Sequence, residues 1–115
     1  MIVEDESLIA FSLEDDFQDQ GYAVSGSFSS CADALAALAR VIPEVAVVDA
    51  TLSDGSCLEL ARELRRLDVP FLVYSGRNAI DEQAPELAGI VWIEKPAPSA
   101  SVVLAATRLL TQGPA

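Results

Sequence analysis

Short apolar runs alternate with segments of helical periodicity along this 115-residue chain. In the helical segments, apolar residues recur every three or four positions, which is the spacing of a helix with one buried face. This alternation is typical of a parallel β-sheet whose strands are connected by helices. We therefore predict an α/β fold with five strands, at Ile2-Val3, Ala23-Val24, Val45 to Val48, Phe71 to Tyr74 and Ile90 to Ile93.

The five predicted strands differ in how they are expected to be covered. The third, fourth and fifth runs lack polar residues at alternate positions, as expected for strands buried on both faces of a sheet. The second run, in the stretch YAVSGS, is short and polar enough to be an edge strand. The first run begins almost at Met1, so we expect a shortened first strand.

Four helices are predicted from their apolar stripes. The stripes are Ile9, Leu13 and Phe17; Leu35, Leu38, Ala39 and Ile42; Cys57, Leu60, Ala61 and Leu64; and Val102, Ala106, Leu109 and Leu110. The segment NAIDEQAPELAG is a weaker helical candidate, because Pro85 removes an amide donor and interrupts a helix.

Composition and charge exclude several classes of protein. The chain is 51% apolar, but no run approaches the roughly 18 apolar residues that a membrane-spanning helix needs. Its net charge of −11, from 18 acidic and 7 basic residues, repels nucleic acid and anionic membranes. We expect one compact cytoplasmic domain, because the length leaves no room for a second.

The two cysteines, Cys31 and Cys57, are predicted to be reduced thiols. They form no CxxC pair, and the chain has no histidine, so an ordinary structural zinc site is excluded. Cys57 is interpreted as a core residue.

Polar residues follow four of the predicted strands at their carboxyl ends. Glu4-Asp5-Glu6 follows the first strand, Asp49 the third, Ser75 the fourth and Lys95 the fifth. In an open parallel sheet these ends meet at one edge, where functional crevices form. Lys95 is the only lysine of the chain.

Each of these residues also has a simpler interpretation. An aspartate after a strand, such as Asp49, is common in turns, and Glu4 and Asp5 are suited to the positive end of the first helix. Taken alone, Ser75 and Lys95 fit a solvated turn and a solvated surface charge.

Four stretches of the chain, IVEDE, VVDATLSDG, VYSG and WIEKP, resemble the receiver domain of two-component response regulators. The resemblance covers residues 1–115, which it implies are one receiver domain. The implied fold is a five-stranded parallel sheet in the order 2-1-3-4-5, flavodoxin-like, with helices on both faces.

The resemblance also implies a role for each site residue. Asp49 is the phosphoacceptor, Glu4 and Asp5 are the acidic metal pair, and Ser75 is the switch hydroxyl. Lys95 is the conserved lysine that pairs with the phosphoryl group. Trp92 occupies the position of the switch aromatic. Its simplest alternative interpretation is a strand residue packed partly against helices.

The expected cofactor is Mg²⁺, because clustered carboxylates repel one another unless a hard cation holds them, and oxygen ligands suit magnesium. Asp5 and Asp49 are expected to ligate it directly, and Glu4 through water. The backbone carbonyl of Thr51 is expected to complete the set.

The resemblance implies a sensor histidine kinase or phosphotransfer protein as phosphodonor, and a downstream protein target or effector domain as recipient of the signal. It implies no enzymatic activity beyond the domain's own phosphorylation and dephosphorylation. Nucleic acid and membranes are not expected partners. A receiver-like interaction domain that is never phosphorylated remains an alternative.

Two other classes on similar sheets are disfavoured. A nucleotide- or flavin-binding module needs a phosphate loop, and no GxGxxG or GxxxxGK[ST] follows any strand. A haloacid-type phosphatase needs a second aspartate two residues after Asp49, where this chain has Thr51.

The sequence departs from the family pattern in two regions. Ser53 stands where proline is usual, and Cys57 where glycine is frequent. The stretch LAGIVW replaces a common Gly-Ala pair and, together with Pro85, makes the fourth helical region the least certain part of the prediction.

Overall fold

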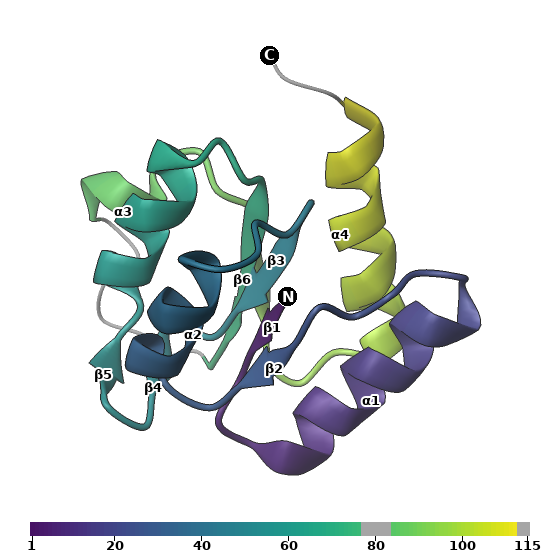
Figure 1. Ribbon diagram of the computed structural model, residues 1–115. Coiled ribbons are helices and arrows are strands. Elements are labelled where there is room, and N and C mark those ends of the chain that lie inside the picture. Colours follow the sequence, from purple (N-terminus) through teal and green to yellow (C-terminus); the bar gives the residue numbers. More distant parts are fainter. Residues whose placement is uncertain (77–83, 113–115) are drawn as a thin grey trace.

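A five-stranded parallel sheet forms the centre of the computed structural model, which describes residues 1–76 and 84–112 (Figure 1). The strands lie in the order β2-β1-β3-β6-β7, which is the predicted order 2-1-3-4-5. Their bounds are Ile2–Val3 for β1, Ser27–Phe28 for β2, Ala46–Val48 for β3, Phe71–Ser75 for β6 and Trp92–Glu94 for β7. The predicted α/β fold is therefore confirmed.

Helices cover both faces of this sheet. Figure 1 shows α1 (Ser7–Asp19) and α4 (Ser99–Gln112) on one face, and α2 (Cys31–Leu38) and α3 (Leu58–Arg66) on the other. Successive side chains of a strand point to opposite faces. On β6, accordingly, Val73 packs with α2 and α3, whereas Leu72 and Tyr74 pack with α1 and α4.

The predicted helical stripes are confirmed in α1, α3 and α4. Leu13 and Phe17 are buried on α1, Leu60, Ala61 and Leu64 on α3, and Val102 and Ala106 on α4. Burying one such aliphatic or aromatic side chain stabilises a fold by about 1.5–3 kcal/mol, so these stripes hold the helices against the sheet.

The stripe predicted for the second helix is wrong at its end. The helix stops at Leu38, Ala39 is its C-cap, and Ile42 is 58% exposed. The buried face instead uses Cys31, Ala34, Ala37 and Leu38. Three of these four side chains are small, so they carry a weaker apolar signal in the sequence than Leu35 and Ile42.

The second strand lies later in the chain than predicted. The prediction placed it at Ala23-Val24, but the pairing runs through Ser27–Phe28, which align with Ile2 and Val3 of β1. Because β1 has only two residues, only two residues of the chain before α2 can pair with it. Val24 contributes instead to the core under α1 and α4.

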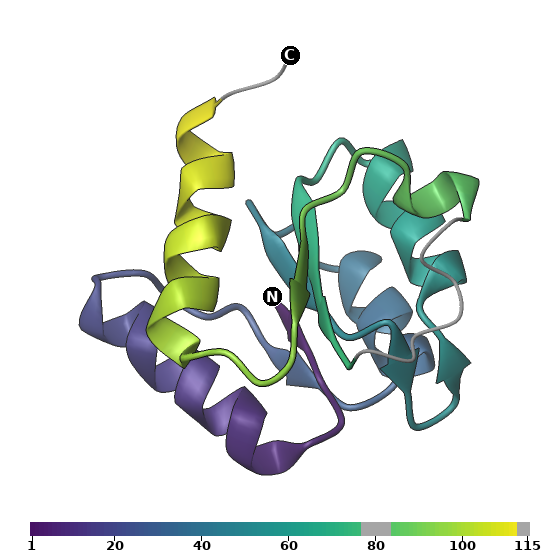
Figure 2. The same cartoon turned by 180° about the vertical axis from the view of Figure 1, so that it is seen from behind.

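The fifth apolar run was predicted to be buried on both faces, and this is wrong. β7 is the edge of the sheet opposite β2, and its three residues are half-buried or exposed (Figure 2). Val91 is 44% exposed. Absence of polar alternation therefore did not distinguish this edge strand from the central strands β3 and β6.

The weak fourth helical segment, NAIDEQAPELAG at residues 78–89, lies partly outside the described residues, because residues 78–83 are not among them. Its described part is a single 3₁₀ turn, Pro85–Leu87, which starts at the proline that was expected to interrupt a helix. Arg62 of α3 bonds the Glu86 carboxylate at 2.8 Å, and the Arg65 guanidinium bonds the Glu86 carbonyl at 2.7 Å. These contacts attach the turn to α3.

A small antiparallel hairpin, which was not predicted, follows β3. It consists of β4 (Thr51–Leu52) and β5 (Gly55–Ser56), at the lower left of Figure 1. Gly55 has φ +128°, a backbone conformation that favours glycine and allows the tight turn. Within the described residues, no helix is both long and apolar enough to cross a bilayer.

Candidate functional site

The carboxyl ends of four parallel strands bring the predicted polar residues together. Glu4 follows β1, Asp49 follows β3, Ser75 ends β6, and Lys95 follows β7. All but Lys95 are buried, with exposed fractions of 4% for Glu4, 6% for Asp49 and 3% for Ser75. The structure therefore confirms that these side chains meet at one edge of the sheet.

Asp49 lies at the centre of this group. Its Oδ1 accepts hydrogen bonds from the Ser75 hydroxyl at 2.7 Å and from the Thr51 amide at 3.1 Å. Its Oδ2 accepts a hydrogen bond from the Lys95 ammonium at 2.9 Å. Burial alone raises the pKa of an aspartate, but the bonds from Lys95, Ser75 and Thr51 outweigh it and lower the pKa of Asp49. Asp49 is therefore an ionised, oriented carboxylate.

The Lys95 ammonium is surrounded by carboxylates. Its Nζ lies 2.8 Å from Glu4 Oε1, 2.7 Å from Glu6 Oε2 and 2.9 Å from Asp49 Oδ2. Burial disfavours the charge, but the hydrogen bonds to Asp49, Glu4 and Glu6 raise the pKa of Lys95 above its ordinary value. Lys95 is thus a fixed positive charge directed at Asp49. The contact with Glu6 was not predicted, since nothing in the sequence shows which of three consecutive acids faces the lysine.

Glu4 is the site residue whose protonation responds to pH near neutrality. Burial raises its pKa to about 7, and repulsion from Asp49 acts in the same direction, against the hydrogen bonds from Lys95 and the Glu6 amide. The Glu6 amide donates to Glu4 Oε2 at 3.1 Å. The hydrogen bonds from Lys95 and Glu6 therefore offset only part of the cost of burying the charged Glu4 carboxylate.

This pKa predicts how stability changes with pH in metal-free protein. Between pH 4.5, the ordinary pKa of the group, and about 7, the folded chain holds a proton that the unfolded chain releases. The Glu4 contribution to the free energy of unfolding therefore falls as pH rises through this window. Glu4→Gln, which stays neutral, is expected to remove that decline. The measurement is urea unfolding of both proteins with EDTA at pH 5, 6, 7 and 8, and parallel pH dependences would contradict the prediction.

An acidic cluster surrounds the Asp49 carboxylate. Glu4, Asp5, Glu6 and Asp49 each offer one carboxylate oxygen, and these oxygens all lie within 4.8 Å of one another. Asp5 and Glu6 are exposed, whereas Glu4 and Asp49 are buried, so the cluster opens to solvent on one side. An all-oxygen, negatively charged donor set of this kind fits Mg²⁺.

Comparison with known proteins identifies the family of this domain. The family model described as the response regulator receiver domain matches residues 1–106. The chain belongs to this family. It is thus a receiver domain of two-component signalling, and its acidic cluster resembles the phosphorylation site of that family.

Solved structures support this assignment of the receiver domain. The PhyR response regulator REC domain of Erythrobacter litoralis is 27% identical, with 99% of this chain and 92% of that chain covered and a TM-score of 0.80. A response regulator receiver protein from Sinorhizobium medicae WSM419 is 25% identical over 96% of this chain and 91% of that chain, with a TM-score of 0.84. A sensor protein from Polaromonas sp. JS666 is 30% identical over 96% and 94% of the two chains, with a TM-score of 0.80. No curated protein matches the sequence.

Trp92 lies apart from the hydrogen-bonded group of this receiver domain. It pairs with Val73 across β6 and β7, is half-buried, and packs against the core under α2 and α3. This placement agrees with the interpretation of Trp92 as a packed strand residue. Its switch role stays a prediction.

The hairpin after Asp49 is anchored by Asp54, which the sequence analysis did not single out, and by Ser53. The Asp54 carboxylate accepts hydrogen bonds from the amides of Cys31 at 2.8 Å and Ala32 at 3.0 Å, so it caps α2. Ser53 donates its hydroxyl to the Ser29 carbonyl at 2.9 Å. The unusual Ser53 therefore has a structural role. A cap supplied from more than twenty residues away has no local sequence signal.

The two cysteines of the receiver domain, Cys31 and Cys57, are buried and are not joined by a disulfide. Both belong to the core between the sheet and α2 and α3. The interpretation of Cys57 as a core residue is confirmed by its complete burial.

Proposed function

We propose that residues 1–115 act as a cytoplasmic receiver domain that accepts a phosphoryl group on Asp49 from a sensor histidine kinase or a phosphotransfer protein. The observation that carries the proposal is the Asp49 carboxylate, which is buried, ionised and bonded by Ser75 and Lys95 inside the acidic cluster. The domain acts on no other substrate and passes its signal to a downstream protein target or effector domain.

In the proposed reaction, an Asp49 oxygen forms a bond to phosphorus as the bond from phosphorus to the donor nitrogen breaks, and the imidazole leaves. A bound Mg²⁺ supplies charge compensation for the incoming phosphoryl group. Asp5, Asp49 and the Thr51 carbonyl would hold it directly, and Glu4 through water. Because phosphoryl transfer depends mainly on positioning and electrostatics, the protein needs no further nucleophile or base.

Lys95 and Ser75 would then exchange partners. In the unphosphorylated structure both side chains donate hydrogen bonds to Asp49, Lys95 at 2.9 Å and Ser75 at 2.7 Å. Once Asp49 carries the phosphoryl group, the ammonium would pair with one phosphoryl oxygen and the hydroxyl would donate to another. This exchange is the proposed switch, because it changes what the ends of β6 and β7 contact. Trp92 on β7 would report and transmit it.

An exposed apolar surface beside the site fits the proposed protein donor. Leu8 is 82% exposed and Phe11 69% exposed, and both lie on α1 just after the acidic cluster. A partner that brings a phosphohistidine to Asp49 would cover these side chains. The chain's net charge of −11 favours a partner with basic residues around that contact.

The fluorescence of Trp92, the only tryptophan, tests this function. Mg²⁺ is expected to change its emission, and beryllofluoride, a phosphoryl mimic, to add a second change only when Mg²⁺ is present. The order follows because the acidic cluster repels an anion until a cation neutralises it. High salt should weaken the Mg²⁺ step by screening. An equal response to beryllofluoride without Mg²⁺ would contradict the proposal.

Asp5 and Glu6 give a charge-matched test of the proposed metal ligands. Asp5→Asn is expected to weaken Mg²⁺ binding about tenfold or more, the size of a lost interaction with a charged group. Glu6→Gln removes the same charge from a side chain that is 61% exposed and pairs with Lys95, so its effect should be much smaller. Mg²⁺ titrations of both variants decide the matter, and equal losses would refute the assignment of Asp5.

A further inference from the structure

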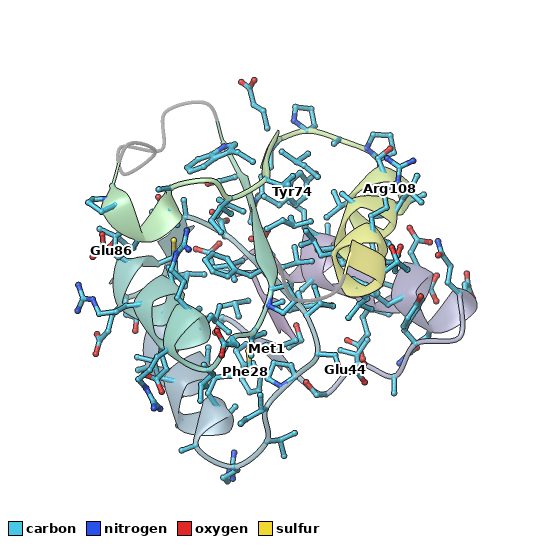
Figure 3. All side chains as sticks on the ribbon, turned by 90° about the horizontal axis from the view of Figure 1, so that it is seen from above. Met1, Phe28, Glu44, Tyr74, Glu86 and Arg108 are labelled. Carbon is cyan, nitrogen blue, oxygen red and sulfur yellow. The ribbon has the colours of Figure 1, made fainter. Side chains whose placement is uncertain are left out.

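Tyr74 is a buried residue beside the site that the sequence analysis did not single out. It precedes Ser75 on β6, is 4% exposed, and lies on the face of the sheet covered by α1 and α4 (Figure 3). A tyrosine in such an environment needs a partner for its hydroxyl. Here the hydroxyl donates to the Ala97 carbonyl at 3.0 Å and accepts from the Ala97 amide, also at 3.0 Å.

These two bonds fix the chain just after Lys95. Ala97 follows Lys95 by two residues, and one phenol oxygen satisfies both of its backbone groups. The chain before Lys95 is fixed by β7, where Glu94 aligns with Ser75, and the Lys95 amide donates to the Ser75 carbonyl at 2.8 Å. The backbone of Lys95 is therefore held on both sides by two consecutive residues of β6.

The Tyr74 ring also contacts the Lys95 side chain. The Lys95 Nζ lies 5.6 Å from the ring centroid, within the range of a cation–π interaction. The same Nζ bonds Asp49 at 2.9 Å. The ammonium is thus directed toward Asp49 from a position beside the aromatic ring.

We infer that Tyr74 is a positioning residue that sets the place of the Lys95 ammonium at Asp49. The hydroxyl does so through the backbone of Ala97, and the ring through its contact with Nζ. The consequence for phosphoryl binding rests on the proposed function, whereas the effect on Lys95 in the free protein does not. Phenylalanine retains the ring but leaves the Ala97 amide and carbonyl without their partner, so the segment after Lys95 relaxes.

The single lysine of the chain makes the experiment direct. Protein grown with lysine labelled with ¹³C at Cε gives one side-chain NMR signal, that of Lys95. In Tyr74→Phe this signal is expected to shift and broaden without any ligand. Tyr22→Phe, which removes a hydroxyl from a tyrosine that is 38% exposed, is the control and should leave the signal in place. A Lys95 signal unchanged in Tyr74→Phe would overturn the inference.

Ligand titrations separate positioning from a general loss of structure. Tyr74→Phe is expected to weaken beryllofluoride binding in saturating Mg²⁺ by about three- to tenfold, the equivalent of one hydrogen bond. Its Mg²⁺ affinity should change by less than about twofold, because the Tyr74 hydroxyl bonds Ala97 and the variant keeps the Lys95 charge in the site. Equal beryllofluoride affinity in Tyr74→Phe and wild type would also overturn the inference.

Failure of the proposed function gives a different result. If beryllofluoride with Mg²⁺ leaves the wild-type Lys95 signal unchanged, the phosphoacceptor proposal fails, and the ligand-free comparison still decides the role of Tyr74. If Tyr74→Phe does not fold, the wild-type protein decides: a nuclear Overhauser contact between the Tyr74 ring protons and the Lys95 Cε protons supports the inference, and its absence overturns it.

Discussion

Asp49→Asn is expected to abolish the response to beryllofluoride, with affinity reduced beyond the measurable range. The acceptor carboxylate accepts hydrogen bonds from Ser75 and Thr51 at Oδ1 and from Lys95 at Oδ2, and an amide at this position presents no carboxylate to complete the phosphoryl mimic. Part of the Mg²⁺ response should persist, because Glu4 and Asp5 remain in the cluster. The measurement is the two-step titration of Trp92 emission.

The control for this prediction is Asp33→Asn, which removes one charge from an exposed residue in the first turn of α2. Both ligand steps should keep their wild-type affinities in the control. A beryllofluoride response in Asp49→Asn that equals that of the control would place the anion elsewhere and remove the main support for Asp49.

Lys95→Ala is expected to reduce phosphorylation by a small phosphodonor about 10- to 100-fold, the loss of one hydrogen bond to a charged group. The same substitution is expected to raise the affinity for Mg²⁺. Removing the ammonium frees the carboxylates of Glu4 and Asp49, from which it lies 2.8 and 2.9 Å, so Mg²⁺ should bind more tightly.

Stability gives a second measure of Lys95→Ala. Without metal, the variant leaves two buried carboxylates without their cation, a change that typically destabilises a fold by about 3–5 kcal/mol. Saturating Mg²⁺ should recover most of this loss. Arg40→Ala, which removes an exposed positive charge, is the control and should change neither stability nor phosphorylation. Unchanged Mg²⁺ affinity and unchanged phosphorylation in Lys95→Ala would refute its assigned role.

The sequence predicted the parts of the fold that depend on strong local patterns. The apolar runs at β3 and β6 are buried along their whole length, and the α3 stripe of Leu60, Ala61 and Leu64 is buried as predicted. The prediction was wrong where the pairing of strands distant in the sequence decides which residues form a strand and which strand lies at an edge. Ser27–Phe28 forms β2 only because two residues of β1 are available to pair with it, and β7 is an edge strand despite its apolar sequence.

The site was predictable to the extent that it follows from strand ends. Glu4, Asp49, Ser75 and Lys95 meet because parallel strands end at one edge of the sheet. The residues that were missed act across long sequence separations. In the sequence, Tyr74 looks like any other core residue of β6. Its bonds to Ala97 form only because β6 and β7 are neighbours in the sheet.

The chemistry of the site cannot be derived from residue types alone. The raised pKa of Glu4 follows chiefly from burial, whereas the lowered pKa of Asp49 follows from three donors that overcome burial. Two carboxylates at the same sheet edge thus differ in protonation behaviour, and only their packing distinguishes them.

The most direct test of Asp49 as a Mg²⁺-dependent phosphoacceptor is intact mass spectrometry after incubation with acetyl phosphate, followed by borohydride reduction and peptide sequencing. With Mg²⁺, we expect the wild-type protein to gain one phosphoryl group and the reduced residue to be found at position 49. Without Mg²⁺, or in Asp49→Asn, we expect no gain. A phosphoryl group located at any other residue, or a gain that Asp49→Asn retains, would contradict the proposed function.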